Sequence, residues 1–133
     1  MARIERFEDL DIFMLARKIA NEVYDISMSG DFAKDFVLRD QIQRAAVSIF
    51  SNIAEGFERN GNKEFLQFLS VAKTSCAEIR VQLLFARDRN YISDEEITLL
   101  CEDLGSLGRQ IGGFCKYPRQ SEMKGIKFNQ SNS

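Results

Sequence analysis

The sequence predicts an all-α fold, an antiparallel up-down-up-down four-helix bundle, and three observations support this prediction. Apolar residues recur at the i, i+3, i+4, i+7 spacing of helices along most of the chain. No alternating apolar run bounded by turn residues indicates a strand, and the single proline is Pro118. The connections between the predicted helices are short, which places each helix beside its predecessor.

The first predicted helix runs from about Asp9 to about Ser27. Asp9 can cap the amides that follow it, and Phe7 can pack against the first turn as a hydrophobic staple. The turn cluster at residues 29–31 ends this helix. The side chains expected to face inward are Leu10, Phe13, Ala16, Ala20, Val23 and Tyr24.

The second predicted helix, from about Lys34 to a C-terminal cap at Gly56, is apolar on two sides. On a wheel of about 100° per residue, the core stripe contains Leu38, Ile42, Ala45, Ala46, Ile49 and Ile53. A second stripe lies roughly 100° further round and contains Val47, Phe50, Ala54 and Phe57. A single bundle interior would leave the second stripe uncovered, so we expect it to contact other subunits of an oligomer.

The third predicted helix runs from about Lys63 to Arg89, with Asn62 as its N-terminal cap. Its apolar residues alternate spacings of four and three, which is the seam of a helix bundle. They are Phe65, Leu69, Ala72, Cys76, Ile79, Leu83 and Ala86.

The fourth predicted helix begins at Ser93, because Ser93 and Glu96 form a capping box. The helix weakens near Gly112 and is stopped by Tyr117-Pro118. Residues 1–118 are therefore predicted to form the bundle, and residues 119–133 a disordered polar tail. The seam of this helix is Ile97, Leu100, Leu104, Leu107, Ile111 and Phe114.

Composition excludes several classes of function. The 133-residue chain has the length of one domain and contains no histidine, which excludes Ser-His, Cys-His and imidazole-metal chemistry. Cys76, Cys101 and Cys115 are odd in number and lack a C-x-x-C pair, so we interpret them as reduced, mostly small core residues. No apolar run resembles a signal or membrane-spanning segment. We expect a cytosolic protein without metal, cofactor or membrane contact.

A polar stripe follows the second predicted helix. It consists of Gln41, Arg44, Ser48, Asn52, Glu55 and Arg59. Such side chains make directed hydrogen bonds, although the stripe could also be a solvated flank with ion pairs. A catalytic role for Glu55 is disfavoured, because no nucleophile-base pair, glycine-rich phosphate loop or metal-spaced carboxylate cluster accompanies it. We interpret the stripe as a hydrogen-bonded brace for the fold or a ring, and the protein as not an enzyme.

A basic line follows one edge of the third predicted helix. Lys73, Arg80 and Arg87 recur every seven residues, which places them about 10 Å apart. The line could follow phosphates, with Arg44 and Arg59 as further candidates, or the long side chains could only shield the edge of the core. Since the net charge is −2, nucleic-acid binding would require local patches, or their repetition in an oligomer.

Several motifs carry a resemblance to a known family. They are Phe7-Glu8-Asp9-Leu10, the segment from Leu38 to Ile49, the segment from Ser51 to Gly56 with Arg59, Glu64-Phe65 with Phe68-Leu69, and later Ser75 and Glu78. From about Phe7 to Phe114 the chain resembles the four-helix bundle family of proteins encoded by intervening sequences in bacterial large-subunit ribosomal RNA genes. Phe50 stands where that family commonly has proline, which should straighten the helix or alter its outer contact.

The same fold is shared by the accessory variability protein of diversity-generating retroelements, a pentameric ring that binds nucleic acid and a reverse transcriptase. This resemblance implies a homopentameric scaffold that binds RNA or DNA, with a reverse transcriptase as one possible kind of protein partner. The alternative is a protein-protein interaction adapter that binds no nucleic acid. A third hypothesis, a small-ligand or metal enzyme built in the bundle interior, is disfavoured by the absence of histidine.

Overall fold

The computed structural model describes residues 4–59 and 61–116, and within these ranges the fold is helical, with four long helices and no β-strand. The helices are α1 (Asp11–Ser27), α2 (Phe36–Glu58), α3 (Asn62–Asp88) and α4 (Asp94–Lys116). Two short 3-10 helices, η1 (Phe7–Asp9) and η2 (Gly30–Lys34), precede α1 and α2. The predicted stop at Tyr117-Pro118 and the predicted tail at 119–133 lie outside the described residues.

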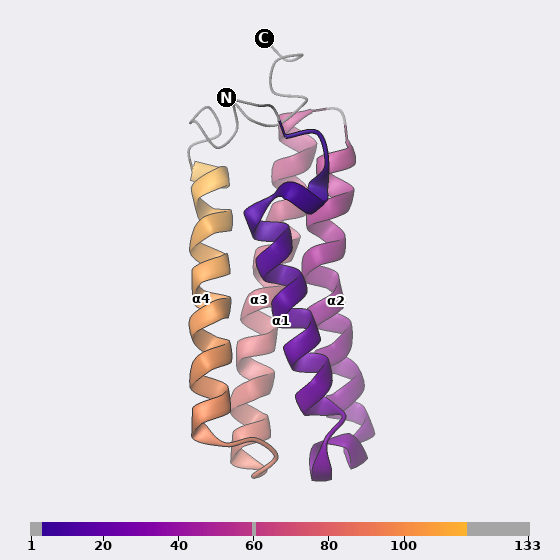
Figure 1. Cartoon of the computed structure of the whole chain (residues 1–133), viewed down its shortest axis with the longest axis vertical. Helices are drawn as coiled ribbons and strands as arrows, with labels where there is room; N and C mark the ends of the chain where they lie inside the picture. The colour runs from indigo at the N-terminus through magenta and orange to yellow at the C-terminus, as the bar shows by residue number, and fades with distance from the viewer. Residues whose placement is uncertain (1–3, 60, 117–133) are drawn as a thin grey trace.

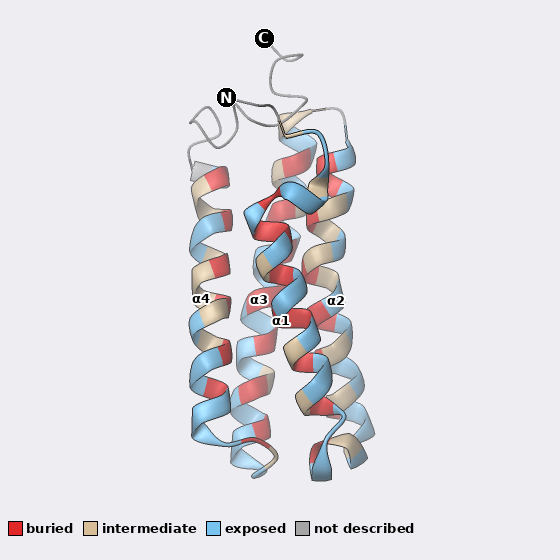
Figure 2. Ribbon diagram, viewed as in Figure 1, coloured by how far each residue is buried: buried red, intermediate tan, exposed pale blue. Residues whose placement is uncertain are grey.

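Consecutive helices run in opposite directions, as predicted (Figure 1). Each helix packs against its predecessor, and α1 also contacts α4. The core is built from the stripes that the sequence indicated, and every predicted seam residue of α3 and α4 is buried. Buried positions line the sides of the helices that face one another (Figure 2). Tyr24 of α1, predicted to face inward, is instead 49% exposed, while Ile12 and Ile19 are buried.

The helix starts were predicted with mixed success. The capping box of α4 is confirmed, because the Ser93 amide donates to Glu96 Oε1 at 2.9 Å and the Glu96 amide donates to Ser93 Oγ at 3.1 Å. The prediction for Asp9 is wrong, since Asp9 lies within η1 and Leu10 is the N-cap of α1. Phe7 does pack against that first turn, with its ring centroid 4.9 Å from that of Phe13.

The starts of α2 and α3 also differ from the prediction. Helix α2 starts at Phe36, because Asp35 Oδ1 accepts a hydrogen bond from the Leu38 amide at 3.1 Å. The N-cap of α3 is Gly61, and Asn62 is the first residue of the helix. The predicted start of α2 at Lys34 is therefore two residues early and the predicted cap of α3 one residue late, within the range over which helix ends vary.

Gly56 was predicted to end the second helix, and this prediction is wrong. Helix α2 continues to Glu58. A Cβ atom at Gly56 would lie 2.7 Å from Phe68 Cβ and 3.0 Å from Phe65 Cδ1 of α3. Glycine is needed here because the two helices approach each other more closely than a side chain would allow.

Within the described part of the chain, none of the helices combines the length and the hydropathy needed to span a bilayer.

Candidate nucleic-acid interface

The basic line predicted on the third helix lies on the edge of α3 that faces α4. Lys73, Arg80 and Arg87 are all exposed. Lys73 and Arg80 line a hollow of about 330 Å³ between α3 and α4, which we call the α3–α4 groove. The other lining residues are Cys76 and Ala77 of α3, and Leu104, Gly105, Gly108, Arg109 and Gly112 of α4.

Arg109 of α4 adds a third cation to the α3–α4 groove. Among the residues that the structure describes, no carboxylate lies within 4.0 Å of the charged nitrogens of Lys73, Arg80 or Arg109. Three like charges from two helices thus line one groove, and the described residues of its lining include no carboxylate. Such an arrangement raises the local positive potential and favours the binding of an anion.

Arg87 differs from the other cations of the predicted line. It lines a neighbouring hollow together with Leu84, Ile97, Thr98, Cys101 and Glu102. Its Nε also lies 3.9 Å from Asp94 Oδ1. The carboxylates of Asp94 and Glu102 offset the charge of Arg87, so the cation cluster is Lys73, Arg80 and Arg109 rather than the predicted line.

Three glycines of α4 form the floor of the α3–α4 groove. Gly105, Gly108 and Gly112 are spaced by three and four residues, and each costs a helix interior about 1 kcal/mol relative to alanine. A Cβ atom at Gly105 would lie 3.3 Å from Arg109 Nη1, and one at Gly112 would lie 3.6 Å from Lys73 Nζ. A Cβ atom at Gly108 would meet no atom within 4 Å. The charged groups therefore lie close to the α4 backbone, above a floor without side chains.

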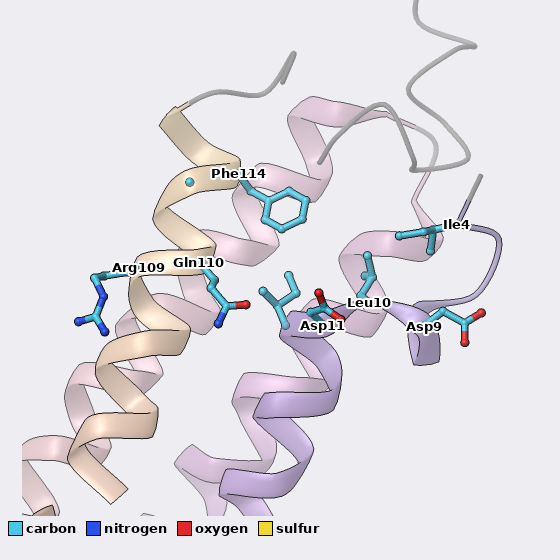
Figure 3. Close-up of a pocket in the computed structure, with 9 residues that line it drawn as sticks. Ile4, Asp9, Leu10, Asp11, Arg109, Gln110 and Phe114 are labelled. Atoms are coloured by element: carbon cyan, nitrogen blue, oxygen red, sulfur yellow. The ribbon is translucent and has the colours of Figure 1, made fainter. Parts of the chain in front are cut away.

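Arg109 also borders a second hollow, of about 520 Å³, between the start of α1 and the end of α4. Ile4, Leu10, Ile12 and Phe114 give this hollow an apolar lining, and Asp9 and Asp11 add carboxylates. Gln110 points across it towards α1, whereas the Arg109 side chain points away from it (Figure 3). The carboxylates of Asp9 and Asp11 make this hollow a poor site for a phosphate. The Arg109 charge therefore contributes to the α3–α4 groove, which Arg109 also lines.

The predicted polar stripe of α2 faces α3 and borders a different hollow, of about 540 Å³, which we call the α2–α3 groove. Ser75 Oγ of α3 donates to Ser48 Oγ at 3.1 Å. Asn52 Nδ2 donates to Ser48 Oγ at 3.0 Å and to the Ser48 carbonyl at 2.7 Å. The lining residues are Gln41, Arg44, Ala45, Ser48, Ser75, Glu78 and Gln82. The centre of the stripe is thus hydrogen-bonded within α2 and linked to α3 by the Ser75–Ser48 hydrogen bond.

Arg44 and Arg59, the other two candidate phosphate contacts, lie away from the α3–α4 groove. Arg44 is exposed at the rim of the α2–α3 groove. Arg59 Nη2 lies 3.0 Å from Glu55 Oε1, and its guanidinium lies over the Phe68 ring at 5.1 Å. The structure therefore does not bring these two arginines together with Lys73 and Arg80.

The predicted subunit-contact stripe of α2 is largely covered by the chain itself. Phe57 is fully buried, so the prediction that it contacts another subunit is wrong. Phe50 packs edge-to-face against Phe13 of α1, with ring centroids 6.0 Å apart, and is half-buried like Ala54. Val47 is 43% exposed. Helix α1 therefore covers part of the second apolar stripe of α2, which we expected other subunits to cover.

The cysteines differ in their environments. Cys76 is buried beneath the α3–α4 groove, and this burial raises the pKa of its thiol to about 11. Cys115 is exposed, which contradicts its interpretation as a core residue. Partial burial nevertheless raises the pKa of the Cys115 thiol, although the nearby positive charge of Lys73 opposes the shift. Over the ranges 4–59 and 61–116, no group of three His, Cys, Asp or Glu residues is placed to hold a metal ion.

The sequence profile of the 23S rRNA-intervening sequence protein family matches residues 8–113. The chain belongs to this family. A search of curated proteins found no match.

A similar solved structure supports the same fold. It is the crystal structure of a protein with unknown function from the S23 ribosomal protein family of Bacteroides thetaiotaomicron. The two chains are 21% identical, and the TM-score is 0.72 over 79% of this chain and 98% of the other. At this identity the comparison shows a shared fold.

The sequence reasoning missed Arg109 and the glycine floor. The spacing of Gly105, Gly108 and Gly112 was visible as one face of the fourth helix. The role of this glycine face could not be predicted, because only the structure shows that it lies opposite Lys73 and Arg80.

Proposed function

We propose that this protein is a non-enzymatic, cytoplasmic scaffold that assembles as a homopentameric ring and binds RNA or DNA. The observation that supports binding is the convergence of Lys73, Arg80 and Arg109 on the α3–α4 groove, without a carboxylate partner among the described residues. A net charge of −2 provides no overall attraction for polyanions. Repetition of the groove around a ring would multiply the phosphate contacts.

Binding is tested by filter assays with ribosomal RNA fragments and duplex DNA over a range of salt concentrations. We expect affinity at low salt and a steep loss as salt rises, because each phosphate contact releases counterions. Arg80→Glu should weaken binding by at least about tenfold at low salt. Arg17→Glu on α1 is the matched control, since Arg17 is exposed and lines neither the α3–α4 groove nor the α2–α3 groove. Equal binding by both variants would contradict the proposal.

The assembly is tested by measuring mass in solution with light scattering. We expect five times the chain mass of 15.3 kDa. Val47, with the half-buried Phe50 and Ala54, is the proposed contact, so Val47→Glu should lower the measured mass by placing a charge in an apolar interface. A monomeric wild-type protein would contradict the proposed ring. It would also mean that each protein molecule carries a single α3–α4 groove for phosphate contacts.

A protein-protein adapter is the second candidate, and exposed apolar side chains favour it. Val37 of α2 is 70% exposed, and Val81 and Phe85 of α3 are 67% and 52% exposed. The resemblance to the accessory variability protein makes a reverse transcriptase one kind of partner to test. A pull-down that survives high salt, from a protein that retains no nucleic acid at low salt, would favour the adapter over the nucleic-acid-binding scaffold.

A further inference from the structure

We infer that the α3–α4 groove binds the phosphodiester backbone of a nucleic-acid strand and does not read its bases. This inference rests on the proposed function and names the chemical group that the same site binds. Cations stand on both walls, Lys73 and Arg80 on α3 and Arg109 on α4. A strand lying between the two helices can therefore place phosphates against either wall.

Among the described residues that line the groove, only the three cations are suited to base recognition. Asn, Gln, Asp and Glu read base edges, and aromatic rings hold unpaired bases by stacking. Apart from the three cations, the lining consists of Cys76, Ala77, Leu104 and the three glycines. The cations Lys73, Arg80 and Arg109 could each contact guanine, so a preference for guanine is the sequence preference that would contradict the inference.

The glycine floor allows a phosphate to approach the α4 backbone. The charged ends of Arg109 and Lys73 lie near Gly105 and Gly112, and Gly108 lies between these two positions along the helix. Because a Cβ atom at Gly108 would meet nothing within 4 Å, packing inside the chain does not require glycine there. An open path between the cations is the property that glycine at this position provides.

Several side chains that could read bases line the α2–α3 groove instead. Gln41, Glu78 and Gln82 line the α2–α3 groove, on the side of α3 that faces α2. Helix α3 itself therefore separates these polar groups from Lys73 and Arg80. A strand held by the α3–α4 cations would not present its bases to them.

Competition binding tests the ligand class with the full-length protein. Fluorescent dT, dA and dC oligonucleotides of equal length, and a guanine-rich oligonucleotide, are titrated at low salt. We expect affinities within about threefold of one another, because backbone contacts carry no sequence information. Inorganic polyphosphate, which has no base or sugar, should displace all four. A preference above about tenfold for one base, or failure of polyphosphate to compete, would overturn the inference.

A pair of glycine variants tests whether the nucleic acid binds at the floor of the α3–α4 groove. Gly108→Leu places a side chain on the groove floor, and Gly113→Leu places the same side chain on α4 at a position that does not line the groove. Both sites have open space for the added Cβ, and circular dichroism checks that both variants fold. We expect Gly108→Leu to weaken binding about tenfold and Gly113→Leu to bind as the wild type does.

The outcomes separate this inference from the proposed function. If Gly108→Leu binds as tightly as the wild type while Arg80→Glu binds weakly, the nucleic-acid function stands and the groove-floor inference fails. If the wild type binds no nucleic acid at low salt, the proposed function fails as well.

Discussion

The two grooves that flank α3 differ in how their polar side chains are partnered. In the α2–α3 groove, Ser48 accepts hydrogen bonds from Ser75 and Asn52, which joins three polar side chains. Gln82 Oε1 of the same groove is the exception, since it is buried without a hydrogen-bond partner among the described residues. In the α3–α4 groove, Lys73 and Arg80 face Arg109 of the opposite helix without a carboxylate among the described residues. Satisfied polar groups stabilise a fold, whereas uncompensated charges at the surface are available to a ligand.

The glycines on the two sides of α3 differ in how closely they are packed. Gly56 of α2 lies at a close approach to α3, whereas Gly108 of α4 lies over open space. One glycine is therefore required by packing, and the other is tolerated at a cost in helix propensity. Four substitutions test whether α3 is closely packed on the side of α2 and open on the side of α4.

Gly56→Ala should have the largest effect on stability. The added Cβ would lie 2.7 Å from Phe68 Cβ, so α2 and α3 must move apart. Overpacking of this kind costs about 1–3 kcal/mol, and urea unfolding followed by circular dichroism measures it. A variant as stable as the wild type would show that the α2–α3 contact is looser than described.

Ser48→Ala should lower the free energy of unfolding by about 1 kcal/mol. The change removes the acceptor of two side-chain hydrogen bonds in a partly buried place. Ser51→Ala is the matched control, because Ser51 is exposed on the same helix. Equal effects of the two substitutions in urea unfolding would argue against a bracing role for the polar stripe.

Gly108→Ala should raise the free energy of unfolding by about 0.5–1 kcal/mol. Alanine has the higher helix propensity, and its methyl group meets no atom within 4 Å. The sign is opposite to that expected for Gly56→Ala, and thermal unfolding under identical conditions compares the two. A loss of stability would mean that the floor of the α3–α4 groove is already filled.

The effect of Cys76 on stability is confined to alkaline pH and concerns the core beneath the groove. Burial raises the pKa of its thiol from 9.0 to about 11 in the folded protein. The unfolded chain releases this proton at lower pH, so the thiol's contribution to stability is complete below about pH 9 and is lost as pH rises to about 11. Urea unfolding over this range should show a shallower decline for Cys76→Ala than for the wild type. Parallel curves would contradict the burial of the thiol.

Periodicity predicted the bundle and most of its core. The seams of α3 and α4 and the capping box at Ser93 depend on local spacing, which the sequence displays directly. Gly56 and Phe57 were misjudged because their surroundings depend on how closely α2 and α3 pack, and spacing carries no information on interhelical distance. Tyr24 was predicted to face inward but is exposed, because a residue at the edge of an apolar stripe can lie on either side of the boundary between core and solvent.

The candidate site was predicted in part. Lys73 and Arg80 could be identified because they repeat along one helix. Arg109 could not be joined to them, since the pairing of faces between α3 and α4 depends on the rotation of each helix about its axis. The polar stripe was recognised as a unit, but its link to Ser75 required the same knowledge of helix rotation.

Removal of one positive charge from each groove shows which of the two grooves binds nucleic acid. Arg80→Gln lies at the α3–α4 groove and Arg44→Gln at the α2–α3 groove, and both arginines are exposed. Anisotropy titrations of a labelled oligonucleotide at low salt compare the two variants with the wild type. We predict that Arg80→Gln weakens binding and lowers the salt dependence by about one phosphate contact, while Arg44→Gln changes neither. Loss of binding in Arg44→Gln alone would contradict the account.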